Sequence, residues 1–287
     1  MHFSSYRSAF IVFVLLIVSS CASVRNPETA QVARASWTAQ TVAPGVVWKY
    51  HHFGDLFDSK QSVTVLDVDL RKVKVDIHYV DSGFFRASAA ATRSGAVAAI
   101  NGSFFDTRRG GSVVFFQYKG KRIKTSSRNP RVYWEAAGFT IDPSGDVSIM
   151  APPDGGWQSL RNGSTVLTSG PLLINNGESV LQAQEKFNTN RHPRTAVGLT
   201  RNNHLIAVVT DGRSSQAHGM SIEELTRVMQ AFKCTVAMNL DGGGSSTAWV
   251  KGQPYNGVVN YPSDNKKFDH EGERALSNCI LFFAGEE

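Results

Sequence analysis

The chain turns at Asn239-Leu240-Asp241-Gly242-Gly243-Gly244-Ser245-Ser246, where an apolar run ends in a carboxylate, three glycines and two hydroxyls. Three consecutive glycines weaken any helix or strand, because glycine loses more backbone freedom on folding than other residues. Their use is to let main-chain N–H groups turn toward a ligand, and such concave runs of amides bind phosphate. The stretch therefore indicates an anion-binding loop beside an acid, although an Asp-Gly pair alone is also a common turn signal.

The apolar segment at residues 235–240, which leads into this stretch, has a counterpart at residues 205–210. Between them, Ser221 and Glu224 form a Ser-x-x-Glu capping box, which satisfies two backbone amides at the start of a helix. Apolar residues then recur at helical spacing, so one face of this helix should be buried. A strand, a helix and a strand at this spacing predict a βαβ unit whose two strands run parallel.

A ligand-binding edge is predicted where these strands end. Asp211-Gly212 follows the first strand and Asp241-Gly242 follows the second, so both carboxylates should emerge at the carboxyl-terminal edge, where open α/β sheets bind ligands. A third apolar run, residues 96–100, ends in Asn101-Gly102. Each pair alone is an ordinary turn signal. Together, three turns whose glycines let a ligand approach the backbone favour one shared site.

Most of the remaining sequence alternates between apolar and polar residues. This period of two appears at residues 63–69 and 73–79, in a hairpin at residues 138–150 and in a last strand at residues 278–283. Since only one helix is well signalled, we expect an α+β fold. It should have a mixed, strand-rich sheet, few helices and the βαβ unit in the C-terminal half.

The N-terminus has the pattern of a lipoprotein signal peptide, residues 1–20. Arg7 supplies a positive charge, and the apolar run that follows is shorter than the roughly 20 residues of a membrane-spanning helix. Small residues precede Cys21, which predicts lipidation of this cysteine; ordinary secretory cleavage near Ala22 is the alternative. We expect export and lipid anchoring to a bacterial membrane, and the non-acidic Ala22 favours the outer membrane and the periplasm.

Residues 21–40 are small and polar and are expected to form a tether, and residues 41–287 are expected to form a single domain. The net charge of +6 is spread over short basic clusters, so no nucleic-acid partner is expected. A weak attraction for anionic substrates is compatible with it. Cys234 and Cys279 remain after the signal peptide; the exported compartment permits a disulfide, and two buried thiols are the alternative.

Two arginines are candidate anion ligands. In His192-Pro193-Arg194, the proline restricts its own backbone and that of the preceding residue, so Arg194 enters a strand in a fixed conformation suited to bidentate phosphate recognition. A structural ion pair is the alternative. His192 is either an acid–base group or a packed side chain. Arg274 follows Glu271-Gly272-Glu273 in a charged segment, either as a second anion ligand or as part of an exposed loop.

The chain resembles the phosphodiester glycosidase family from about residue 82 to residue 283. The most specific motif is the glycine-rich stretch with its preceding Asn-Leu-Asp and the capped helix before it. The Tyr261-Pro262-Ser263-Asp264 segment and the Arg274 region also resemble the family. The other motifs that carry the resemblance are residues 101–105, 192–198 and 211–213.

The resemblance implies a hydrolase that removes a sugar, similar to N-acetylglucosamine, from a sugar-1-phosphodiester or a glycosyl phosphate on a glycan. A phosphate monoester is a good leaving group, so the site needs anion stabilisation and one carboxylate more than a strong acid. Asp241 or Asp211 would be the base or nucleophile, and Arg194 with the Gly242–Ser245 amides would hold the phosphate. The residues expected to bind substrate are Asn101, Gly102, His192, Thr195, Asn239, Gly242, Gly243, Gly244, Ser245 and Arg274.

Three alternatives stay open at this point. Asp211 and Asp241 are hard oxygen ligands that could instead coordinate Ca²⁺ or Mg²⁺. The enzyme could be a phosphodiesterase that cleaves the P–O bond and leaves the sugar phosphate. The protein could also be a non-catalytic glycan-binding lipoprotein, with exposed aromatic side chains as a stacking platform.

Overall fold

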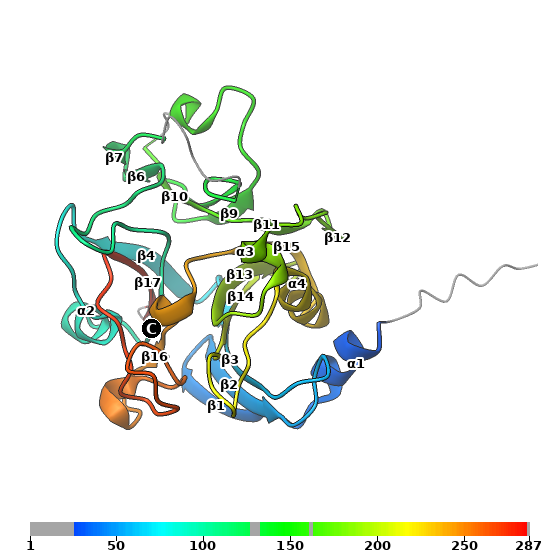
Figure 1. The fold of residues 1–287 in the computed structure, drawn as a ribbon. Helices are drawn as coiled ribbons and strands as arrows, with labels where there is room; N and C mark the ends of the chain where they lie inside the picture. Colours follow the sequence, from blue (N-terminus) through cyan, green and yellow to red (C-terminus); the bar gives the residue numbers. More distant parts are fainter. Residues whose placement is uncertain (1–25, 127–132, 161–162, 286–287) are drawn as a thin grey trace, which may run out of the picture.

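The computed structural model describes residues 26–126, 133–160 and 163–285. These residues form three antiparallel sheets and four α-helices, so the fold is the expected strand-rich α+β arrangement (Figure 1). The helices are α1 (Pro27–Arg34), α2 (Ala87–Ser94), α3 (Lys186–Thr189) and α4 (Ile222–Ala231). Short 3-10 turns are η1 (Trp157–Ser159), η2 (Gly243–Ser245) and η3 (Tyr255–Gly257).

The largest sheet has eight strands and carries both halves of the predicted βαβ unit. In spatial order its strands are β1 (Thr38–Ala43), β2 (Val46–Phe53), β3 (Gln61–Asp69), β14 (His204–Thr210), β13 (Arg194–Thr200), β15 (Cys234–Asn239), β11 (Leu172–Asn175) and β12 (Glu178–Ser179).

Two smaller sheets complete the fold. The four-stranded sheet has the order β16 (Ala248–Val250), β5 (Ala98–Asn101), β17 (Asn278–Ala284) and β4 (Val73–Tyr79). The five-stranded sheet has the order β7 (Lys121–Lys124), β6 (Phe116–Tyr118), β10 (Thr165–Ser169), β8 (Ala137–Ile141) and β9 (Val147–Met150).

The predicted βαβ unit is present, but another strand, β13, lies between its two parallel strands in the sheet. β13 pairs antiparallel with β14 on one side and with β15 on the other, so β14 and β15 run parallel to each other without being neighbours. The reason is that β13 and β14 form a hairpin, which turns at Asn203 in the left-handed region (φ 59°). Helix α4 then crosses over β13, and its capping box is formed as predicted by Ser221 and Glu224.

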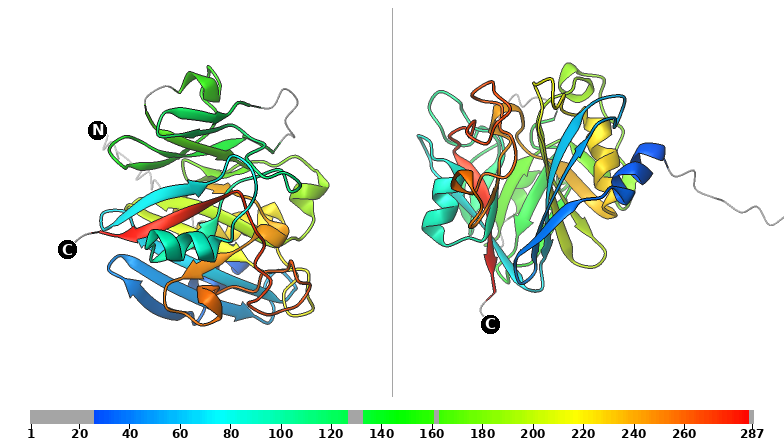
Figure 2. Two further views of the ribbon diagram at one scale, coloured as in Figure 1. Left: turned by 90° about the vertical axis from the view of Figure 1, so that its left-hand side faces the viewer. Right: turned by 90° about the horizontal axis from the view of Figure 1, so that it is seen from below.

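The sheets and helices are layered around one main core. Apolar side chains of all three sheets meet in a single cluster, including Leu66, Ile280 and Phe139. A second cluster lies on the outer face of the eight-stranded sheet, where α1 and α4 cover it, and a third lies where α2 covers the four-stranded sheet. Figure 2 shows these helices on opposite outer sides of the molecule. The buried face of α4 carries Leu225, as its apolar spacing predicted.

The tether predicted at residues 21–40 is wrong for its described part. Residues 26–40 form α1 and the start of β1, and Asn26 caps the helix by accepting from the Glu28 amide at 3.1 Å. Val32 is buried against the main sheet, and this contact gives a short polar sequence a fixed structure. The sequence pattern was misleading because only one side chain of this eight-residue helix, that of Val32, is fully buried.

No helix within residues 26–126, 133–160 and 163–285 is long and apolar enough to cross a membrane. Cys234 and Cys279 are both buried free thiols, on strands of different sheets, so of the two alternatives left open the structure has the unpaired one. The predicted signal peptide and Cys21 lie outside the described residues.

Candidate active site

The site lies where four strand ends meet. Because β13 runs antiparallel to both neighbours, Arg194 at its start lies opposite Thr210, the last residue of β14, and its Ala196 lies opposite Asn239, the last residue of β15. Asp211 and Asp241 therefore follow at the same edge, as predicted. The end of β5, at Asn101, reaches this edge from the four-stranded sheet.

The Asn101 side chain holds these segments together through hydrogen bonds. Its side-chain oxygen accepts from the Thr195 hydroxyl at 2.7 Å and from the Thr247 amide at 3.0 Å, while its Nδ2 donates to the Asp241 carbonyl at 2.8 Å. Asn101 is only 1% exposed. The substrate-binding role predicted for Asn101 and Thr195 is therefore corrected, since these bonds use the side-chain groups that would contact a sugar.

The glycine-rich loop uses most of its own amides. The Gly242 amide donates to its neighbour Asp241 at 2.9 Å, the Gly243 amide donates to the Pro193 carbonyl at 2.8 Å, and the Ser245 amide closes the 3-10 turn. Within the described residues, the Gly244 amide is the one of the four that donates to no backbone or side-chain group. Of the four amides predicted to bind phosphate, only that of Gly244 is thus free to do so in the described part of the chain.

The glycines serve a different purpose, which is close approach of two arginines. A Cβ added to Gly243 would lie 2.9 Å from the Arg213 guanidinium, and one added to Gly244 would lie 2.5 Å from that of Arg274. Gly243 also has a φ of 63°, a conformation that favours glycine. Arg274 is held by an ion pair with Asp264. Two guanidiniums from other segments thus pack against the surface of the loop.

Asp241 is close enough to both arginines for their charges to act on it. Its side chain is half-buried. Burial raises the pKa of Asp241, and this effect is opposed by the Gly242 amide and by the positive charges of Arg274 and Arg213. The result is a partly accessible carboxylate near two guanidiniums. Arg213 was not predicted as a site residue; its place in the Asp211-Gly212-Arg213 motif was the available signal.

Asp211 is not placed to serve as the base or nucleophile, which corrects its prediction as a catalytic residue alongside Asp241. Its carboxylate is fully buried and accepts from the Ser62 hydroxyl at 2.6 Å, from Asn260 Nδ2 at 2.9 Å and from the Tyr261 amide at 2.8 Å. Burial raises the pKa of Asp211 to about 6. Three donors around one carboxylate suit hydrogen bonds and not a cation, so the Ca²⁺ or Mg²⁺ role does not fit it.

Arg194 is also placed differently from the prediction. Its side chain is 1% exposed, its Nε donates to the Met220 carbonyl at 2.9 Å, and its Nη2 donates to the carbonyls of Phe187 and Asn190. The guanidinium lies over the ring of Phe187, 4.7 Å from its centroid. Arg194 therefore ties α3 to the sheet, and its guanidinium is directed away from solvent. Burial lowers its pKa to about 10, so it stays charged at neutral pH.

The remaining predicted residues border the site. His192 is half-buried, and its pKa is lowered by burial and by the nearby charges of Arg194 and Arg213. Asn239 is fully buried and donates to the Gly170 carbonyl at 2.9 Å. A Cβ on Gly102 would meet the Asn278 side-chain oxygen at 2.1 Å, so this glycine permits a close contact between strands.

Several buried hydroxyls in and near the loop have no hydrogen-bond partner among the described residues. They include those of Ser246, Thr247 and Ser263. The Ser245 hydroxyl is close enough to Asp241 to lower its pKa, but it makes no hydrogen bond of normal geometry. Buried polar groups are nearly always satisfied by protein or water. Unpaired hydroxyls of this kind are usually satisfied by bound water.

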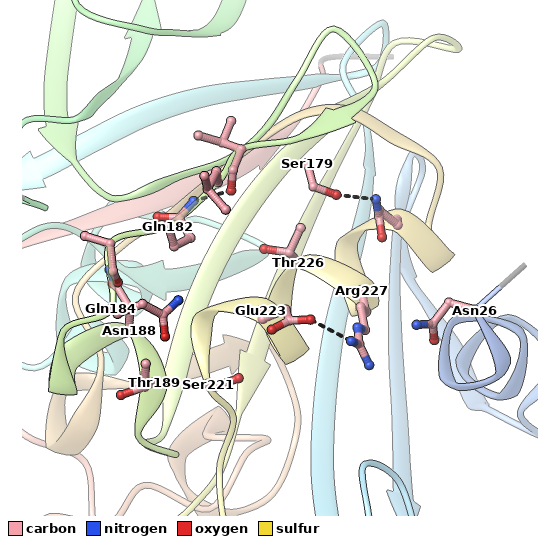
Figure 3. Close-up of a pocket in the computed structure, with 14 residues that line it drawn as sticks. Asn26, Ser179, Gln182, Gln184, Asn188, Thr189, Ser221, Glu223, Thr226 and Arg227 are labelled. Carbon is pink, nitrogen blue, oxygen red and sulfur yellow. Dashed lines mark hydrogen bonds and ion pairs between the residues drawn. The ribbon is translucent and has the colours of Figure 1, made fainter.

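A cavity elsewhere on the described surface has a different lining. It has a volume of about 540 Å³ and lies between α4 and residues 179–189, and its polar side chains largely pair with each other or with the backbone, as in the Arg227–Glu223 ion pair (Figure 3). Within the described ranges, no three His, Cys, Asp or Glu side chains gather closely enough to hold a metal ion.

Several solved structures share this fold. The catalytic domain of zebrafish N-acetylglucosamine-1-phosphodiester alpha-N-acetylglucosaminidase superimposes with a TM-score of 0.65 at 22% identity, over 88% of this chain and 84% of that one. A hypothetical protein from Synechocystis superimposes with a TM-score of 0.62 at 15% identity, over 87% of this chain and 64% of that one.

Sequence similarity points the same way. The mouse N-acetylglucosamine-1-phosphodiester alpha-N-acetylglucosaminidase is 27% identical over 190 residues, which are 61% of this chain and 35% of the mouse protein. The chain thus spans about a third of the length of that relative. Residues 94–283, which include Asn101, Arg213, Asp241 and Arg274, match the phosphodiester glycosidase family. The chain belongs to the phosphodiester glycosidase family.

Proposed function

We propose that the protein hydrolyses sugar-1-phosphodiesters, releasing a sugar similar to N-acetylglucosamine and a phosphate monoester. The observation that carries the proposal is the half-buried Asp241, whose loop packs against the Arg213 and Arg274 guanidiniums, inside the segment that matches the family. The names of the mouse and zebrafish relatives support the sugar and the linkage. Guanidiniums suit a phosphodiester because they bind its oxygens in pairs.

In the proposed mechanism, the carboxylate and the guanidiniums have separate roles. Asp241 acts as general base and takes a proton from a water that attacks the anomeric carbon, while the bond from that carbon to the phosphate oxygen breaks. The electron pair stays with the phosphate, whose charge Arg213 and Arg274 stabilise. Because this leaving group needs no proton, one accessible carboxylate is sufficient. Asp211 holds Asn260 and Tyr261 in place and takes no part in proton transfer.

The first test measures where water attacks. Purified protein should hydrolyse UDP-N-acetylglucosamine, and in ¹⁸O-labelled water the label should appear on the sugar and not on the phosphate. Asp241→Asn should lower kcat by about 10²–10⁴-fold, the usual contribution of a general base. The wild-type kcat/KM should fall as the pH drops through the raised pKa of Asp241, because only the ionised form accepts a proton.

Asp154→Asn is the matched control and should keep full activity. It changes an exposed carboxylate that is distant in sequence from Asp241. Label in the phosphate would show cleavage of the P–O bond and would refute a glycosidase. Full activity of the Asp241→Asn variant would remove the base from the mechanism.

The second test separates the arginines. Arg213→Ala and Arg274→Ala should each lower kcat/KM by about 10²-fold or more, as expected for lost stabilisation of a developing anion. Arg194→Met should instead lower the free energy of unfolding by at least about 2 kcal/mol, because it leaves buried carbonyls without donors. Its folded fraction should keep a kcat/KM near that of the wild type, as measured by denaturation and by steady-state kinetics. A stable but inactive Arg194→Met protein would contradict this assignment.

The third test concerns the buried carboxyl of Asp211, whose pKa rises from 3.8 in an exposed group to about 6 in the folded protein. The folded state therefore holds a proton that the unfolded state has released between these values, so stability falls as the pH rises from about 4 through 6. A shift of this size corresponds to about 3 kcal/mol. Relative to Asp211→Asn, the wild type should lose that amount over this interval, as measured by urea denaturation. A constant difference would show that Asp211 is ionised throughout.

We also propose that Cys21 is lipidated and anchors the protein to the outer membrane on its periplasmic side. The support is the sequence pattern of residues 1–21. Cys21→Ala should abolish incorporation of labelled fatty acid and release the protein from the membrane fraction. Equal labelling of the two proteins would rule the anchor out.

A further inference from the structure

Another cavity has none of the proposed catalytic residues in its lining and takes no part in the mechanism above. It has a volume of about 390 Å³ and lies on the side of the molecule where the segment after β16 approaches α2 (Figure 1). Its walls combine two aromatic rings with charged side chains. The residues that line it are Arg86, Tyr255, Asn256, Val258, His270, Glu271 and Glu273.

The aromatic wall is a column of stacked rings. Tyr255 stacks on His270 with centroids 4.6 Å apart and planes 22° apart, and His270 lies 4.2 Å from Tyr261. Tyr261 in turn stacks on Phe268 at 4.1 Å and 6°. The column is fixed to the interior, because His270 Nδ1 is 2.7 Å from the carbonyl of the fully buried Asn260. Its outer end, Tyr255, is 59% exposed.

The backbone holds this exposed ring at a cost. Tyr255 and Asn256 are consecutive non-glycine residues in the left-handed region, with φ of 54° and 55°. Such a conformation costs about 1–2 kcal/mol per residue for an ordinary side chain. Residues kept in this region cluster at binding sites. The turn therefore presents a rigid aromatic face to solvent, where folding alone gives no reason to place it.

The polar wall is suited to hydroxyl groups. Glu273 is fixed by the Ser88 amide at 2.8 Å and the Ser88 hydroxyl at 2.6 Å, while Glu271 and Arg86 also line the cavity. Two carboxylates against one guanidinium disfavour a phosphate or any other anion. Neutral hydroxyls can donate to carboxylates and accept from a guanidinium, so a neutral polyol matches this wall.

We propose that this cavity is a second, non-catalytic binding site for a neutral sugar ring, which stacks its C–H face on Tyr255 and donates hydroxyl hydrogen bonds to the carboxylates. A flat ring combined with a few convergent polar groups is the usual composition of a small-molecule site. The site is separate from the hydrolytic centre, because Arg274 packs on Gly244 whereas the preceding Glu273 binds Ser88. The second site would bind a glycan whether or not that glycan is a substrate of the hydrolytic centre.

The test is direct binding, measured by saturation-transfer NMR on the mature protein. The probes are β-linked trisaccharides of N-acetylglucosamine, glucose and mannose, which carry no phosphate. At least one should show contacts from its ring C–H protons, and Tyr255→Ala should weaken that binding by about tenfold, a typical contribution of one aromatic contact. Tyr255→Phe keeps the ring and should bind like the wild type.

Leu181→Ala is the matched control, since Leu181 is an equally prominent exposed side chain on another face, 96% exposed. It should leave binding unchanged. Asp241→Asn should also keep full sugar binding, so failure of the hydrolase proposal and failure of this one are distinguishable. Tyr255→Ala should retain the wild-type kcat for UDP-N-acetylglucosamine. Binding of no probe by the wild type, or equal binding by Tyr255→Ala, would overturn the site.

Discussion

The architecture of the candidate active site depends on the buried side chain of Asn101. Its amide joins the end of a strand in one sheet to Thr195 in another and to the backbone on both sides of the glycine-rich loop. A buried amide with all of these bonds made is rigid, and it specifies one arrangement, since any displacement leaves polar groups unsatisfied in a low-dielectric interior. The loop can therefore contain three glycines and still hold Asp241 in a defined place.

The electrostatics follow from that position. Asp241 loses hydration, which raises its pKa, and the two nearby cations oppose this effect only in part. Its side chain stays partly accessible. The two arginines differ in their freedom. Arg274 is held by Asp264, whereas Arg213 is exposed and lies against the loop on its other side. An incoming phosphate would thus meet one fixed and one adaptable guanidinium, which favours orientation without a closed pocket.

The sequence predicted which strands and helix surround the site better than it predicted the side-chain contacts within it. Hydrophobic periodicity and the capping box located α4, β14 and β15, and the direction of the strands brought Asp211 and Asp241 to one edge. The side chains could not be assigned in the same way. Arg194 and Arg213 are both basic residues near glycines, and only the packing of α3 shows that the first is buried and the second exposed. Likewise, only tertiary hydrogen bonds reveal that Asp211 is structural.

The position of β3 and β4 has a consequence for how this family can be handled. The family match begins at residue 94, but β3 forms the ladder along β14 and β4 forms the ladder along β17. A fragment trimmed to the matched segment would expose the unpaired edges of two sheets and open the shared core to solvent, a state prone to aggregation. The recognisable part of the sequence is thus smaller than the smallest unit expected to survive as a soluble fragment.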